Sequence, residues 1–220
     1  VGFVNVPMSD PVDDVGDGFM IGGFPHADST GYAYPPELEG ELESMGYLRD
    51  QMNMMLLPGK EDELRDQFME TMRSRRKVAL EMGQRYSDLD VYWVVFTGTD
   101  RMQHFFWKFM DPQHPSYDAE VAKTMGTAIR DVWVETDQAV GELVAMAREQ
   151  AETEGEEADA SQPDGAGAVT GLTGRTVLLH VEGQLGRAGT RGTADVGDHG
   201  VLAVFGEVER GLPGLHAHAL

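Results

Sequence analysis

Val91-Tyr-Trp-Val-Val-Phe96, followed by Thr97-Gly-Thr-Asp-Arg-Met-Gln-His-Phe-Phe-Trp107, is the clearest indication of fold in this chain. The first part is β-branched and aromatic, which is typical of a buried strand, and Thr97 to Thr99 form the turn that leads into a helix. Two more apolar runs, at residues 176–181 and 201–205, also predict strands. Strands that alternate with helices predict an α/β fold with a mainly parallel sheet flanked by helices.

The helix after this strand carries Asp100 and His104, which are four residues apart. That spacing places both side chains on one face, where a carboxylate oxygen and an imidazole nitrogen can bind one cation at about 2.0–2.2 Å. The carboxyl end of a strand is also where open α/β sheets bind ligands. A second interpretation stays open, in which Asp100 is the N-cap of the helix and His104 is a packed histidine.

The unbroken text from Val95 to Tyr117, VFTGTDRMQHFFWKFMDPQHPSY, resembles the type I phosphodiesterase/nucleotide pyrophosphatase family of the alkaline phosphatase superfamily. Members of that family carry a TGxDxxxHxxW-like block followed by DPxHPxY. The segments Val4–Met8, Gly18–Phe24 and Tyr34–Leu38 resemble the family's upstream strand, glycine loop and proline turn. The resemblance implies an alkaline phosphatase-like fold, and because the chain begins without an initiator Met we expect that fold to be incomplete.

The resemblance also implies chemistry. Such enzymes hold two divalent metal ions, usually zinc with manganese possible, which activate the attacking oxygen and stabilise the leaving one. Their Thr or Ser nucleophile lies N-terminal to the part present here, and neither Ser9 nor Thr99 stands in a matching context, so the nucleophile is unassigned. His114 belongs to the DPxHPxY-like block and is expected either to line the substrate entrance or to be a turn histidine.

The second metal position is where the chain departs from the family pattern. Family members usually end the strand at residues 176–181 with Ser-Asp-His-Gly, whereas Glu182-Gly-Gln184 follows here. Asp198-His199-Gly200 is either that motif, displaced, or the family's later Gly-x-His block. We favour the second alignment, because the apolar run after Gly200 resembles the strand expected there.

In the favoured alignment, His199 joins Asp100 and His104 on one metal ion. Three such ligands with an open fourth position are a sensible set for zinc. Asp198, beside His199, is kept as a candidate ligand because of the alternative alignment.

A change in composition divides the chain. Residues 1–150 are interpreted as the central part of the catalytic domain, 151–174 as an acidic linker or insertion, and 175–220 as a shortened C-terminal part of the same domain. Within the first part, helices are predicted at 44–51, at 61–84 and from about 117 to 150. In the second of these, an apolar stripe includes Leu64, Phe68, Met72, Val78 and Met82. The basic residues Arg73, Arg75, Arg76 and Lys77 are interpreted as a solvated face balanced by neighbouring acids, with contact to a phosphate-bearing substrate as the alternative.

The charge of the chain limits its partners. Acidic residues number 38 against 17 basic ones, giving a net charge of −21. Such a field repels polyphosphate, which argues against binding of nucleic-acid polymers or anionic membranes. Adaptation to high internal salt is our hypothesis for this composition, and loss of the folded state on dialysis to low salt would be its signature. The oligomeric state stays open.

Other features predict a location. The chain has no cysteine, so it has neither disulfides nor thiolate metal sites. It shows no apolar run long enough to span a bilayer and no signal peptide. We therefore predict a cytoplasmic protein that does not associate with membranes.

Two function hypotheses follow from these observations. In the first, the chain is a metal-dependent hydrolase of small phosphoric esters, of the phosphodiesterase/nucleotide pyrophosphatase type, and is a fragment that lacks its nucleophile. In the second, it is a catalytically inactive, diverged or truncated member of the family that acts as a scaffold or interaction protein.

Overall fold

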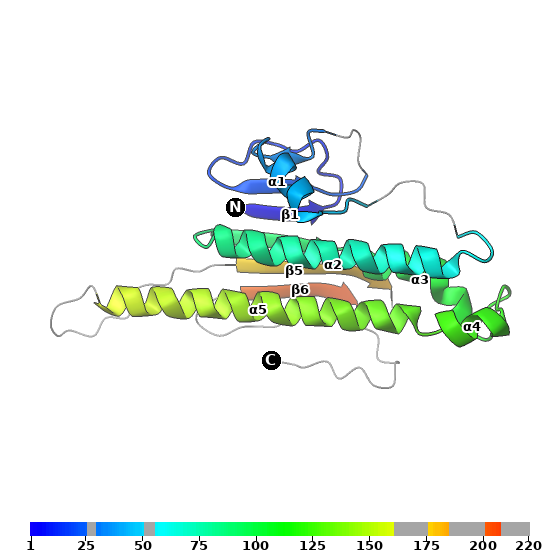
Figure 1. Ribbon diagram of the computed structural model, residues 1–220. Coiled ribbons are helices and arrows are strands. Elements are labelled where there is room, and N and C mark those ends of the chain that lie inside the picture. The colour runs from blue at the N-terminus through cyan, green and yellow to red at the C-terminus, as the bar shows by residue number, and fades with distance from the viewer. Residues whose placement is uncertain (26–29, 51–55, 161–175, 185–200, 208–220) are drawn as a thin grey trace.

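The computed structural model describes residues 1–25, 30–50, 56–160, 176–184 and 201–207 (Figure 1). For residues 151–160, 176–184 and 201–207 only the backbone is described. The elements follow one another along the chain as β1 Gly2–Val6, β2 Phe19–Gly22, β3 Ala33–Tyr34, α1 Leu38–Met45, α2 Glu61–Arg85, β4 Val91–Phe96, α3 Gly98–Met110, α4 Ala119–Met125, α5 Ala128–Ala160, β5 Thr176–Gln184 and β6 Val201–Glu207.

The strands form a six-stranded sheet in the order β3-β2-β1-β4-β5-β6. Every neighbouring pair is parallel except β2 and β3, which are antiparallel. The structure thus confirms an α/β fold with a mainly parallel sheet, and it confirms the strands predicted at 91–96, 176–181 and 201–205. The chain continues from β1 to β2 on one side and later places β4 on the other, so the strand order reverses between β1 and β4.

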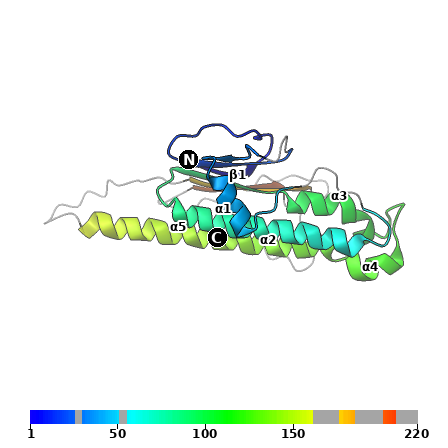
Figure 2. The same cartoon turned by 45° about the horizontal axis from the view of Figure 1, so that its top comes forward.

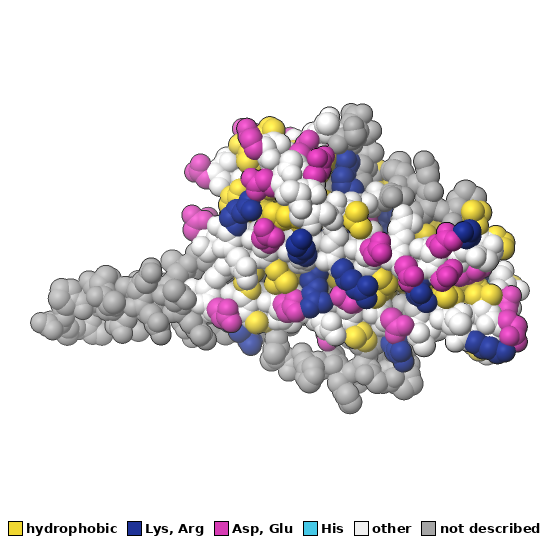
Figure 3. Space-filling view, in the orientation of Figure 1, with side chains coloured by type: hydrophobic (Ala, Val, Ile, Leu, Met, Phe, Trp, Pro, Cys, Tyr) yellow, Lys and Arg dark blue, Asp and Glu magenta, His cyan; other side chains and the backbone are white. Residues whose placement is uncertain are grey.

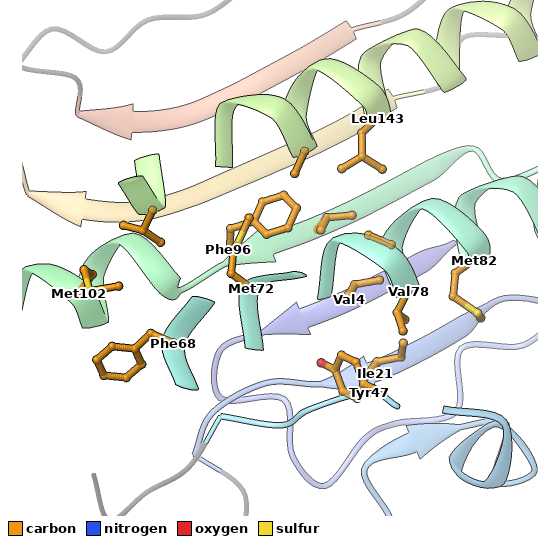
Figure 4. Close-up of a cluster of buried hydrophobic side chains, with 14 of the residues drawn as sticks. Val4, Ile21, Tyr47, Phe68, Met72, Val78, Met82, Phe96, Met102 and Leu143 are labelled. Atoms are coloured by element: carbon orange, nitrogen blue, oxygen red, sulfur yellow. The ribbon is translucent and has the colours of Figure 1, made fainter. Parts of the chain in front are cut away.

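Helices α2, α3 and α5 pack together on one face of the sheet (Figures 1 and 2). The apolar stripe predicted on α2 is buried, and it meets inward-facing side chains of β1, β2 and β4. Figure 4 shows Val4 and Ile21 beside Val78 of α2, with Phe96 beside Met72. This packing anchors the first turns of α3 at the carboxyl end of β4, because strand and helix are joined by Thr97 alone.

The helix predicted at 44–51 is wrong. Helix α1 ends at Met45, since Gly46 takes the left-handed conformation with a φ of 74°. The amides of Gly46 and Tyr47 donate back to the carbonyls of Glu43 and Leu42, which closes the helix. Residues 47–50 are therefore not helical, and Asp50 can turn toward the sheet.

The single helix predicted from 117 to 150 is also wrong, because Gly126 separates α4 from α5. A Cβ at Gly126 would lie 2.6 Å from the carbonyl oxygen of Ala122, so only glycine fits this junction. Helix α5 then extends to Ala160, which makes residues 151–160 of the predicted linker helical. In the described part of the chain, no helix has the length and apolarity needed to cross a membrane.

Candidate functional site

The strand order reverses between β1 and β4, and open α/β sheets usually bind ligands at the carboxyl ends of the strands on either side of such a reversal. Asn5 near the end of β1 is fully buried and has a φ of 59°, a left-handed conformation that Asn tolerates. Its amide Nδ2 donates to the carbonyl of Val95 at 3.1 Å, which ties the two strands together. The start of α3, immediately after β4, is thereby held at this edge of the sheet.

Asp100 and His104 lie on the first two turns of α3, as the sequence predicts. The N-cap residue is Thr97 rather than Asp100, and the His104 side chain is 72% exposed rather than packed. The alternative interpretation of both residues is therefore wrong. The Nε2 atom of His104 lies 3.4 Å from Oδ1 of Asp100, whose side chain is 36% exposed, so the two donor atoms face one another at the surface.

A metal ion needs more than this pair. Within the ranges that the structure describes, no group of three or more His, Asp or Glu side chains could hold a metal ion together. A carboxylate and an imidazole suit zinc or manganese, but catalytic zinc sites use three protein ligands. The described residues thus supply two ligands of a candidate site and leave the third unassigned.

Asp198 and His199 lie outside the described residues. Strand β6 begins at Val201, and the parallel register pairs Val201 with Thr176 and Thr176 with Val91. The beginning of β6 is therefore at the amino edge of the sheet, whereas Asp100 follows the carboxyl end of β4. The register therefore does not support the prediction that Asp100 and His199 bind one metal ion together. That arrangement stays a prediction.

The remaining candidates have local structural roles. The Nδ1 atom of His114 accepts a hydrogen bond from the amide of Ser116 at 3.0 Å, in a turn after α3. The hydroxyl of Ser9 donates to the carbonyl of Val6 and accepts from the amide of Gly23. Thr99 is fully buried, so its hydroxyl is not presented to a substrate. A role for His114 at the substrate entrance stays a prediction.

The segment that carries the exposed pair also contributes to a largely buried ion cluster, formed by Asp50, Arg75, Thr97 and Arg101. The Nη2 atom of Arg75 is 3.3 Å from Oδ2 of Asp50, and its Nη1 donates to the hydroxyl of Thr97 at 2.8 Å. That hydroxyl in turn donates to Oδ2 of Asp50 at 2.9 Å. On the other carboxylate oxygen, Nε of Arg101 lies 3.4 Å from Oδ1.

The charges of this cluster hold Asp50 in its ionised form. Burial alone would raise the pKa of Asp50, but the guanidinium groups of Arg75 and Arg101 and the Thr97 hydroxyl together hold that pKa below its ordinary value. Burial also raises the pKa of the adjacent Tyr47 hydroxyl, despite its nearness to Arg75, so it stays neutral. Arg101 additionally covers the ring of Phe24, with its guanidinium carbon 4.7 Å from the ring centroid.

The interpretation of Arg75 as part of a solvated face is wrong, because its side chain is fully buried. A signal was present in the sequence, since Arg75 stands three residues after Met72 and seven before Met82, within the apolar stripe. No comparable signal marks Asp50, which sequence reasoning placed in a helix without a role. Its partners are distant in the chain, and only folding brings them together.

Comparisons of the chain with protein-family models, curated proteins and solved structures found no match. The family resemblance therefore remains a prediction that rests on the motifs themselves.

Proposed function

We propose that this chain is part of a metal-dependent hydrolase of small phosphoric esters, of the phosphodiesterase/nucleotide pyrophosphatase type. The observation that carries the proposal is the exposed pair of Asp100 and His104, whose donor atoms are 3.4 Å apart. The pair lies at the carboxyl end of β4, beside the point where the strand order reverses, which is the usual ligand position in such sheets. An alkaline phosphatase-like arrangement of the sheet belongs to the same proposal.

In this proposal, Asp100 and His104 are two ligands of a divalent cation, zinc or manganese, and a third ligand comes from outside the described residues. A bound cation of this kind polarises a phosphoryl oxygen and neutralises charge that develops on it. The role of the chain itself is to present the carboxylate and the imidazole side by side, on a helix that the fold holds rigidly. Exposure of His104 leaves room for an ester to approach.

The decisive experiment is metal stoichiometry by elemental analysis, on protein folded in molar KCl and washed with chelator. We expect about one zinc or manganese ion per chain in the wild type. The double variant Asp100→Ala/His104→Ala should lose it, whereas His114→Ala, which removes one histidine from a nearby turn, should retain it. Hydrolysis of bis(4-nitrophenyl) phosphate by a longer chain should then depend on the same pair.

A second function has an observation in its favour. The described residues bring two metal ligands together rather than three, as expected if the chain keeps the scaffold of its family without catalysis. This inactive form would act as a scaffold or interaction protein. Metal content in the wild type no higher than in the double variant would establish it and exclude the hydrolase.

A further inference from the structure

The ion cluster of Asp50, Arg75, Thr97 and Arg101 has an unusual position for a purely structural feature. Asp50, Arg75 and Thr97 are almost completely buried, whereas the Arg101 side chain is 15% exposed. Thr97 and Arg101 belong to the junction between β4 and α3 and to the first turn of α3, the same segment that carries the exposed pair. A buried charge is costly unless paired, and apolar residues of the same size often stabilise a core as well as an ion pair does. The position of the cluster therefore calls for another explanation than stability.

Thr97 supplies the first step of that explanation. A threonine at the N-cap of a helix usually accepts a hydrogen bond from a first-turn amide. The side chain of Thr97 makes no such bond, because its hydroxyl donates to Asp50 and accepts from Arg75. The residue that begins α3 is thus bound to the interior of the protein instead of to its own helix.

Arg101 supplies the second step. Its amide donates to the carbonyl of Thr97 at 3.1 Å, which is the first hydrogen bond of α3, and its side chain reaches Asp50. The carboxylate of Asp50 therefore holds α3 at two points that are one turn apart. Two attachments along one stripe of a helix fix its rotation about its own axis as well as its start.

Rotation of α3 determines where the candidate ligands point. Thr97 and Arg101 are four residues apart and form one stripe along the helix. Asp100 and His104, also four apart, form a second stripe that is shifted by three residues in the sequence. At 3.6 residues per turn, the stripes lie about 60° apart around the helix. An inner stripe held by Asp50 therefore sets the direction of the outer stripe.

We propose that Asp50 is a positioning residue, which through Thr97 and Arg101 fixes the orientation of the Asp100–His104 pair. The inference rests on the proposed function, because it assigns Asp50 to support the same metal site. Groups that hydrogen-bond metal ligands directly typically contribute about 10–100-fold to metal affinity. Asp50 acts through α3 rather than on the ligands themselves, so the lower end of that range is expected for its loss.

The test replaces one hydroxyl by a methyl group at two buried threonines. Thr97→Val breaks one of the two links between Asp50 and α3 and leaves the one through Arg101, whereas Thr136→Val is the matched control. Thr136 is as deeply buried, and its hydroxyl donates to the carbonyl of Val132 within α5 rather than to a member of the ion cluster. For each variant, zinc affinity is measured in molar KCl by competition with a chelating dye, and hydrogen exchange of the α3 amides is measured without metal.

We expect Thr97→Val to weaken zinc binding by about 10-fold and to speed exchange in the first turns of α3. Thr97→Ser, which keeps the hydroxyl, should restore both properties, and Thr136→Val should change neither. Asp50→Asn is a second test that does not depend on Thr97→Val being stable, with the same expected pattern. Equal effects of Thr97→Val and Thr136→Val, or unchanged α3 exchange in Asp50→Asn, would overturn the inference.

The two proposals fail in different ways. Absence of zinc from the wild type removes the proposed function, and hydrogen exchange alone then decides whether Asp50 orients α3. Zinc that binds equally well to the wild type, Thr97→Val and Asp50→Asn removes the positioning role and leaves the metal site standing.

Discussion

Arg75 and Arg76 are neighbours on α2, yet they make opposite kinds of ion pair. Arg75 is fully buried, and its Nη2 lies 3.3 Å from Oδ2 of the buried Asp50. Arg76, with a side chain that is 23% exposed, lies between Glu135 and Glu142 of α5, and its Nη1 is 2.9 Å from Oε1 of Glu135. Figure 3 shows the setting of the second kind, with acidic and basic side chains interspersed over the surface.

The difference between Arg75 and Arg76 shows that one basic segment can supply both a buried and a surface ion pair. A helix turns by about 100° per residue, so adjacent side chains can face the core and the solvent. At the surface, water screens the charges and each pair adds little to stability. In the interior, Asp50 and Arg75 depend on each other, because either charge left alone would remain desolvated.

The largest effect is expected for Arg75→Met. This change leaves the Asp50 carboxylate buried with only Arg101 and Thr97 beside it, and loss of one partner of a buried ion pair typically costs about 3–5 kcal/mol. The free energy of unfolding, measured by urea titration in molar KCl, should fall by that amount. A fall below about 1 kcal/mol would show that water reaches the cluster and that the pair behaves like a surface pair.

The second prediction concerns acid. The pKa of Asp50 is lowered in the folded state, so its ionised form contributes stability above the unfolded pKa of about 3.9, and this contribution is lost as pH falls through the folded pKa. The difference in unfolding free energy between wild type and Asp50→Asn should therefore be constant from about pH 7 to 5 and shrink below about pH 4.

Glu142→Gln is the control for acid. The pKa of Glu142 is also lowered, chiefly by its hydrogen bond to Arg76, but its side chain is nearly half exposed. The free energy of unfolding of Glu142→Gln should differ little from that of the wild type at every pH, since solvent screens the pair. If the free energy of unfolding depended more strongly on pH through Glu142 than through Asp50, the surface pair would matter more than the buried one, and the prediction would be wrong.

The smallest effect is expected for Arg76→Met. Loss of its surface pairs should lower the free energy of unfolding by about 0–1 kcal/mol at low salt. The difference should vanish in 1 M KCl, where the Debye length is about 3 Å, while the effect of Arg75→Met persists. Unfolding of both variants at 0.1 M and 1 M KCl measures this directly, and an Arg76 effect that survives high salt contradicts it.

Local patterns predicted much of the fold. The strand at 91–96 and the helix from Glu61 are confirmed. Burial of apolar side chains gives a hydrophobic pattern that can be recognised within a short stretch of sequence. The ends of helices were predicted less well. Gly46 and Gly126 each end a helix, and their presence was visible in the sequence, although the surrounding apolar periodicity continues past both.

The candidate site was predictable only in part. Asp100 and His104 share a face because of their spacing, which needs no tertiary information. Asp50 could not be found in this way, since its partners Arg75 and Thr97 are distant in the sequence, and a lone aspartate after a glycine turn is typical of any surface loop.

The sequence by itself determined the strand and helix that carry Asp100 and His104, the helix face they share and the acidic character of the whole chain. Only the tertiary structure decided that Arg75 is interior, that Asp50 joins it, and that Thr97 binds this pair instead of capping its own helix. The physical reason is desolvation. Hydrophobic periodicity acts between residues close in sequence, whereas the state of a buried charge depends on groups that only the folded chain brings within contact.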